Sequence, residues 1–118
     1  MFATLASGFP RPALPAATAA DDVVRAVVAE LEVAGLSILS DGDVRRDDPL
    51  GGLAARLQGF EIGDRGPFLG TGRTFRRPRA IHEPRWDGAM YVREWQVAAG
   101  ATALPVKQIG RASCRERV

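Results

Sequence analysis

A dense cluster of charged side chains follows a short apolar run in the first half of the sequence. The segment ILSDGDVRRDD, residues 38–48, holds four Asp and two Arg within its last eight residues. Asp41 and Asp43 flank a glycine, so the chain can turn tightly there and aim a carboxylate inward. Such a carboxylate would bind a substrate ammonium group. Arg45 and Arg46 would bind a carboxylate or pair with the acidic residues beside them.

The same segment also has the features of an ordinary surface turn. In an Asp-Gly-Asp sequence an Asp side chain often bonds its own backbone, and an Arg-Arg-Asp-Asp run often neutralises itself in solvent. The segment lacks the further spaced oxygen ligands of a calcium loop. Because the segment directly follows an apparent parallel strand, a binding site and an ordinary turn remain alternative interpretations of it.

The elements that must position this cluster alternate between short apolar strands and helices. The clearest helix carries one apolar stripe, formed by Val24, Val27, Val28 and Leu31. Thr18 followed by Asp21 resembles a capping box, and Gly35 is a natural helix stop. Strands are predicted over residues 2–6, 36–39 and 103–108, and helices over residues 18–36, 49–60 and 89–100.

The central segments have weaker patterns. Residues 49–60 begin with a proline suited to a first helical turn and continue with three leucines on one face. Residues 61–85 are rich in Gly, Pro and Arg, without a clear period, and predict a long excursion that includes a hairpin. In the helix at 89–100, the apolar side is expected to comprise Val92, Trp95 and Ala99.

This order indicates a parallel sheet with right-handed crossovers, typical of an α/β fold. Three parallel strands cannot close a barrel, so the chain is expected to be the first part of a larger domain. Loops after the carboxyl ends of parallel strands form the ligand-binding face. We therefore expect SGFPRP, the charged cluster and Lys107 to meet on one rim. There Ser7 and the Gly8 backbone would hydrogen-bond a small polar ligand.

An arginine-rich segment lies within the excursion. Residues 73–79 hold four Arg and one Phe. Such a segment would bind phosphate, a polyglutamate tail or nucleic acid, or would form an exposed hairpin arm. Acidic residues nearby favour the exposed arm. His82 has no partner at metal-ligand spacing and is interpreted as an ordinary loop histidine, and Trp86 and Trp95 as packing residues.

The net charge of the chain depends on its last ten residues. The formal charge of +2 is carried by IGRASCRERV, residues 109–118, so residues 1–108 are formally neutral. That string is the translation of ATC GGA AGA GCG TCG TGT AGG GAA AGA GTG, a common sequencing-library adapter. We expect residues 109–118 to be an adapter-derived tail, with no role for Cys114. A neutral chain without a long apolar run or a signal sequence is expected to be cytoplasmic, with neither nucleic acid nor membrane as a partner.

The ordered motifs resemble the catalytic domain of the cobalamin-independent methionine synthase family. SGFPRP is similar to that family's first-strand loop, and AGLSILSDGDVRRDDPLGGLAARLQGF to its second strand and the following helix. GRTFRRP is similar to its arginine-rich segment, and MYVREWQVAAGATALPVK to the helix that leads into its third strand. The resemblance spans nearly all of residues 2–108, and the order and spacing of the motifs make it specific.

The resemblance implies an α/β fold: the first part of a TIM (β/α)8 barrel, truncated after about the third strand. Residues 1–108 would be the N-terminal part of that barrel. It also implies a zinc-dependent methyltransferase that moves a methyl group from 5-methyltetrahydrofolate, or a related donor, to the thiol of homocysteine or a similar acceptor. The family's zinc ligands, His, Cys, Glu and Cys, lie in later strands. The implied zinc would therefore be bound beyond this chain, which alone would be inactive.

The resemblance also assigns site residues by position. Ser7, Gly8 and Phe9 match the loop that touches the amino acid, and Asp43 matches the carboxylate that binds its ammonium group. Arg73 and Thr74 match a segment near the folate. The sequence departs from the family in the order of the glycine and serine, in Asp43 for the usual Glu, and in Thr74 for a typical Cys. Alternatives are a decarboxylase or corrinoid methyltransferase of the uroporphyrinogen-decarboxylase type, and a non-enzymatic module that binds anions through its arginines.

Overall fold

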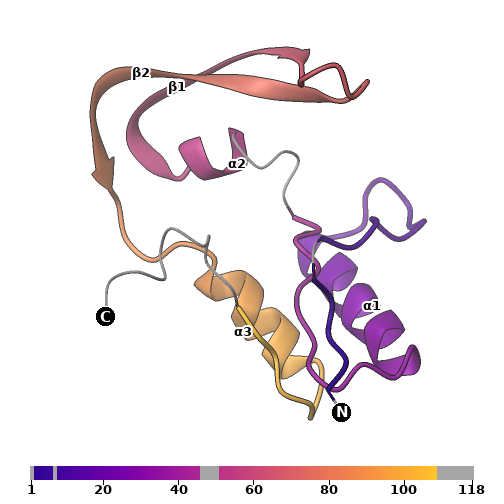
Figure 1. Ribbon diagram of the computed structural model, residues 1–118. Coiled ribbons are helices and arrows are strands. Elements are labelled where there is room, and N and C mark those ends of the chain that lie inside the picture. Colours follow the sequence, from indigo (N-terminus) through magenta and orange to yellow (C-terminus); the bar gives the residue numbers. More distant parts are fainter. Residues whose placement is uncertain (1, 7, 46–50, 109–118) are drawn as a thin grey trace. The chain divides into compact units, whose positions relative to one another are not determined.

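The computed structural model describes residues 2–6, 8–45 and 51–108. The chain divides into two compact units, which we call the core unit (residues 1–45 and 91–118) and the hairpin unit (residues 46–90). Figure 1 shows their elements. Ser7, residues 46–48 of the charged cluster and the expected tail at 109–118 lie outside the described residues.

Helix α1 (Ala20–Val33) forms the centre of the core unit. Its predicted apolar stripe is confirmed, because the stripe residues are at most 2% exposed, and Val23 joins them. The helix ends in a Schellman motif. Gly35, at a φ of 78°, donates its N–H to the Glu32 oxygen, and Leu36 donates to the Leu31 oxygen. The stop predicted at Gly35 is thus confirmed.

The predicted capping box at the start of α1 is wrong. The residue that precedes the helix is Ala19, and no side chain caps the free N–H groups. Asp21 instead forms ion pairs with Arg45 and Arg93. Tertiary partners thus compete successfully for a carboxylate that the local pattern assigns to a helix cap.

Parallel pairing in the core unit is shorter than predicted. The three segments expected to form strands are joined by two isolated parallel bridges, Thr4 with Ile38 and Leu39 with Val106. Backbone bonds extend the second bridge, with Leu39 N donating to Pro105 O and Lys107 N donating to Leu39 O, both at 2.9 Å. The order of the segments agrees with the prediction, whereas the described residues of these three segments form bridges rather than full strands.

Helix α3 (Val92–Gly100) buries a different face from the one predicted. Its buried residues are Glu94, Val97 and Ala98, whereas Val92 and Trp95 are 44% and 41% exposed. Trp95 donates its indole N–H to Val106 O at 3.0 Å. The core that α3 shares with α1 is completed by Leu39 and Val44, with Leu5, Phe9, Leu36, Leu104 and Val106 packed around it.

The hairpin unit replaces most of the helix predicted over residues 49–60. Helix α2 covers only Gly51–Ala54, and strand β1 (Leu57–Pro67) follows directly. Two adjacent glycines weaken the helix, and Leu57 pairs with Trp86 in the sheet. Strand β2 (Thr74–Trp86) runs antiparallel to β1, which confirms the predicted hairpin.

The hairpin is irregular and exposed. Its register shifts between Gln58 and Phe60 and again between Ile62 and Arg65. Between the strands, Phe68 N donates to Arg73 O at 2.9 Å, and the rings of Phe68 and Phe75 meet edge to face at 5.5 Å. Trp86, interpreted as a packing residue, is 71% exposed. No helix of the described residues has the length and apolar character needed to cross a bilayer.

Candidate functional site

The loops after the first two segments of the core unit touch each other. Phe9 N donates to Gly42 O at 2.8 Å, and a side-chain carbon placed on Gly8 would lie 3.4 Å from the same oxygen. Gly42 has a φ of 66°, and a side-chain carbon there would approach a Val27 methyl carbon to 2.8 Å. Glycine is therefore required at position 42, where the two loops and α1 converge.

The two aspartates beside Gly42 are held in place by the turn that contains them. Asp41 is only 5% exposed, and its Oδ1 accepts a hydrogen bond from Asp43 N at 3.2 Å. Ser40 Oγ accepts one from Gly42 N at 3.2 Å. Asp43 has a left-handed backbone, with a φ of 55°. The predicted turn, with Asp bonded to its own backbone, is confirmed and includes both carboxylates.

A small cavity lies where the three segments of the core unit meet. Its volume is about 160 Å³, and its walls are Leu5, Ala6, Ser40, Asp41, Gly42, Asp43, Lys107 and Gln108. Lys107 reaches across the segments, because its ammonium group donates a hydrogen bond to Leu5 O. The structure thus brings Gly8, Phe9, Asp43 and Lys107 into one neighbourhood. Their roles in binding stay predictions.

An ion-pair cluster supports the loop that carries Asp43. Asp21 of α1 pairs through one oxygen with Arg45 and through the other with Arg93 Nη2 at 2.8 Å. The Arg45 side chain is 18% exposed, so this pair is partly shielded from water. Arg45 thus contacts a helix 24 residues away in the sequence, a partner that the local pattern does not predict. Its predicted binding of a carboxylate stays a prediction, and its other predicted partners, Asp47 and Asp48, lie outside the described residues.

Arg73 and Thr74 lie in the hairpin unit, where the chain enters β2. Both are exposed, and Thr74 Oγ1 accepts a long hydrogen bond of 3.4 Å from Arg65 Nη1. Arg73 N donates to Thr71 Oγ1 at 3.3 Å. No contact in the described residues assigns these two side chains to a pocket, and their predicted role near a folate stays a prediction.

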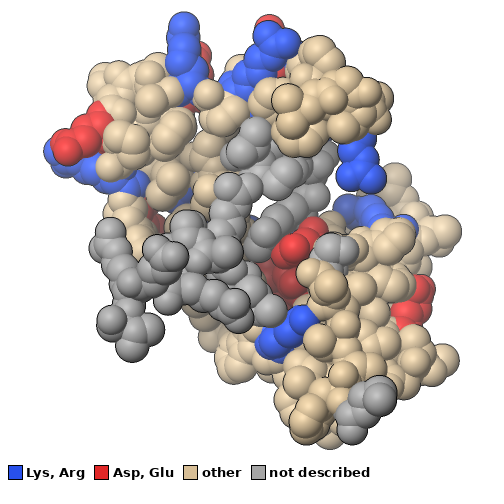
Figure 2. All heavy atoms as spheres, viewed as in Figure 1, with Lys and Arg blue, Asp and Glu red and all other residues tan. Residues whose placement is uncertain are grey.

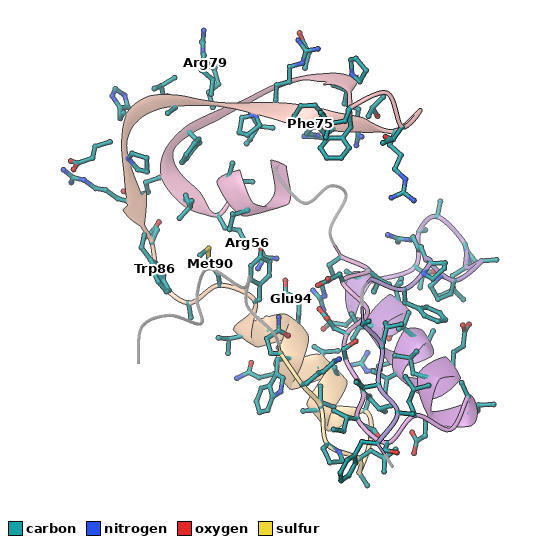
Figure 3. The ribbon with its side chains drawn as sticks, viewed as in Figure 1. Arg56, Phe75, Arg79, Trp86, Met90 and Glu94 are labelled. Atoms are coloured by element: carbon teal, nitrogen blue, oxygen red, sulfur yellow. The ribbon has the colours of Figure 1, made fainter. Side chains whose placement is uncertain are left out.

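The arginines of the hairpin are mixed with acidic side chains. Arg79 pairs with Glu61 across the strands at 2.6 Å, and Arg85 lies 3.7 Å from Glu83. Figure 2 shows basic and acidic side chains interspersed on this unit, and Figure 3 shows Arg79 projecting away from the strands. His82 is exposed on β2. The hairpin thus presents a mixed surface on which acidic side chains lie close to Arg79 and Arg85.

A second and larger hollow lies at the base of the hairpin. Its volume is about 440 Å³, and its lining residues are Ala55, Arg56, Leu57, Gln58, Asp87, Ala89 and Met90. Arg56 and Met90 are labelled in Figure 3. The lining combines one cation, one carboxylate and short apolar side chains, and no sequence motif predicts it.

The residues that the structure describes do not fit the implied zinc ion. Across residues 2–6, 8–45 and 51–108, no three His, Cys, Asp or Glu side chains are grouped as a metal site requires. The small cavity holds two carboxylates, Asp41 and Asp43, which are fewer protein ligands than a zinc site requires. The cavity is thus better suited to an organic ligand than to zinc.

Sequence patterns do not predict the positions that three polar residues occupy in the structure. Ser40 lines the cavity, Asp21 pairs with two arginines, and Glu94 is 3% exposed on the packed face of α3. Glu94, Val97 and Ala98 follow a spacing of i, i+3 and i+4 along α3. This spacing alone could have predicted which face of the helix is buried. Nothing local indicates the partners of Asp21.

Comparison with known proteins finds similarity in fold. No family model and no curated protein matches the sequence. The fold is similar to the solved structure of a B12-independent methionine synthase from Shewanella sp. W3-18-1 in complex with selenomethionine. The TM-score is 0.70 at 18% sequence identity, over 88% of this chain and 36% of that chain. The chain thus shares the fold of about a third of that protein, as the family resemblance predicts.

Proposed function

We propose that this chain is part of a methyltransferase of the B12-independent methionine synthase type and binds its amino acid substrate. Two findings support the proposal: the fold likeness, and a small cavity that lies where three parallel segments end and is lined by two carboxylates of one turn. The second carries most weight, because ligands of α/β folds bind at the carboxyl ends of strands. The protein with the similar fold was solved with an amino acid, selenomethionine.

In this proposal the three segments of the core unit are the first strands of a (β/α)8 barrel. Their parallel bridges join them in chain order, with α1 and α3 packed together beside them. A complete barrel of this kind needs about 250 residues. The match covers 36% of the similar chain, which agrees with the proposal that this chain supplies only a few strands of such a barrel.

The proposed role of Asp43 is to accept hydrogen bonds from the ammonium group of the substrate. The left-handed backbone at Asp43 and the bond from its N–H to Asp41 Oδ1 fix the position of this residue before a ligand arrives. A fixed carboxylate loses little entropy on binding, which favours affinity. Gly8 and Phe9 form the adjacent wall through the contact with Gly42.

The proposed reaction moves a methyl group from a folate donor to the substrate thiol. Since the described residues do not fit a zinc ion, their contribution is to bind and orient the amino acid. Arg73 and Thr74 would contact the methyl donor, as the family resemblance implies. The whole reaction requires the complete gene product.

Ligand binding by this chain tests the proposal. We expect L-methionine and L-homocysteine to perturb the amide NMR signals of Gly8 and Gly42, and Asp43→Asn to weaken binding by about 10-fold or more, since it removes a charged hydrogen bond. Asp64→Asn, on the exposed hairpin, is the matched control and should bind as the parent does. Equal binding by the parent and Asp43→Asn would contradict the assigned role.

An assay of methyl transfer tests the proposal that the complete protein is a methyltransferase. The source DNA should be read across the codon for Gln108, and the complete gene product should then be assayed with homocysteine and other thiols. We expect a thiol to be methylated. A zinc-loaded complete protein that methylates no thiol would overturn the methyltransferase assignment.

A further inference from the structure

We infer that Lys107 binds the α-carboxylate of the ligand, so that the cavity selects amino acids with a free carboxylate. This inference rests on the proposed function, and it adds a residue that neither the family resemblance nor the fold likeness assigns. It starts from the charges around the cavity. Of the described residues that line it, Lys107 is the cation and Asp41 and Asp43 are the anions.

The backbone fixes Lys107 relative to the carboxylates. Lys107 N donates to Leu39 O at 2.9 Å, one residue beyond the bridge between Leu39 and Val106. The chain leaving Leu39 passes directly into Ser40 and Asp41. The lysine and the acidic turn are thus attached to adjacent parallel segments at the same end, and this position does not depend on side-chain flexibility.

The Lys107 ammonium group retains hydrogen-bonding capacity. It donates one bond to Leu5 O, and an ammonium group has three donors. Within residues 2–6, 8–45 and 51–108, no carboxylate lies within ion-pair distance of it. The side chain is half-buried, so part of its hydration is already lost. A ligand carboxylate would replace that hydration with a charge-assisted bond.

An amino acid zwitterion complements this arrangement. Its ammonium group requires anionic acceptors, and its carboxylate requires cationic donors. Both occur in one cavity of about 160 Å³, a size that suits a small ligand better than a nucleotide or a peptide. A simple amine would use only the acidic side and would leave the lysine charge without compensation.

The alternative is that Lys107 only ties the third segment to the first, through its bond to Leu5 O. Such a structural role would affect all ligands alike. A role in carboxylate binding would affect only ligands that possess this group. A ligand series therefore separates the two roles.

The experiment measures binding of L-methionine, L-methioninamide and 3-(methylthio)propylamine to the parent chain and to two variants. Lys107→Met keeps most of the apolar stem and removes the charge, and Lys107→Arg keeps the charge. We expect the parent to prefer methionine over both carboxylate-free ligands by about 10-fold or more, the usual effect of a charged hydrogen bond. Lys107→Met should abolish this preference and Lys107→Arg should retain part of it.

Each other outcome overturns the inference in a distinguishable way. If the parent binds all three ligands equally, and Asp43→Asn weakens all three, the lysine role is wrong and the proposed function stands. If Lys107→Met weakens all three ligands equally, the lysine is only structural. If no ligand binds to the parent, the proposed function fails and the inference fails with it.

Discussion

The core unit and the hairpin unit use similar charged residues in opposite ways. The core unit buries some of its charges and holds them by backbone bonds, as at Asp41, which is 5% exposed. In the hairpin unit they are exposed and pair across strands, as Arg79 and Glu61 do at 76% and 54% exposure. Charge density alone therefore does not indicate a binding site. Burial and backbone support distinguish the two regions.

The largest expected difference concerns apolar side chains. Leu39→Ala in the core unit should lower the free energy of unfolding by about 2–5 kcal/mol, because Leu39 is fully buried in the shared core. Leu69→Ala, at a residue 85% exposed between β1 and β2, should change it by less than about 0.5 kcal/mol. Urea unfolding measures the free energy of unfolding of both variants. Equal decreases would show that Leu69 is packed as tightly as Leu39.

A pair of glycines offers a sharper comparison. Gly42 and Gly70 have nearly the same φ, 66° and 67°. A side-chain carbon at Gly42 meets Val27 and Phe9 within 3 Å, whereas one at Gly70 has no atom of the described residues within 4 Å beyond its chain neighbours. Gly42→Ala should therefore destabilise the chain by about 1–3 kcal/mol more than Gly70→Ala, the usual penalty of overpacking.

The thermal midpoints of the two glycine variants measure this difference. Both variants carry the same backbone strain, so any difference comes from the neighbours of position 42. Identical midpoints would mean that the loops around Gly42 are not packed as described.

The smallest expected difference concerns ion pairs. Asp21→Asn removes a carboxylate that holds two arginines and is 26% exposed, and should cost about 1–2 kcal/mol. Glu61→Gln breaks the exposed pair with Arg79 and should cost at most about 0.5 kcal/mol. Chemical unfolding at low and high salt measures the stability of both variants. A larger loss of stability for Glu61→Gln than for Asp21→Asn would contradict the expectation that ion pairs stabilise the core unit more than the hairpin unit.

The success of sequence reasoning depends on whether local patterns or distant partners decide a feature. The stripe of α1, its stop at Gly35 and the meeting of the strand-end loops could be predicted, because periodicity and topology act locally or through a general rule. The likeness to B12-independent methionine synthase could also be anticipated from ordered motifs. The hairpin within residues 61–85 could be predicted as well, because its Gly- and Pro-rich sequence favours turns.

Other features could not be predicted, because distant partners decide them. The leucines of residues 49–60 suggest a helix, but Leu57 pairs with Trp86 in the hairpin. In α3 the apolar Val92 and Trp95 suggest the packed side, but contact with α1 selects the face of Glu94 and Val97. Pairing of Asp21 with Arg45 overrides a local cap. In each case a weak local preference gives way to a tertiary contact.

The core unit is discontinuous in sequence, and this has a consequence for how the chain tolerates change. The hairpin unit is an insertion between Arg45 and Tyr91, and the bridge between Leu39 and Val106 closes the loop that contains it. The entropy of loop closure grows only with the logarithm of length, so doubling such a loop costs about 0.6 kcal/mol. A change in the length of the hairpin unit should therefore cost the core unit little of its free energy of folding.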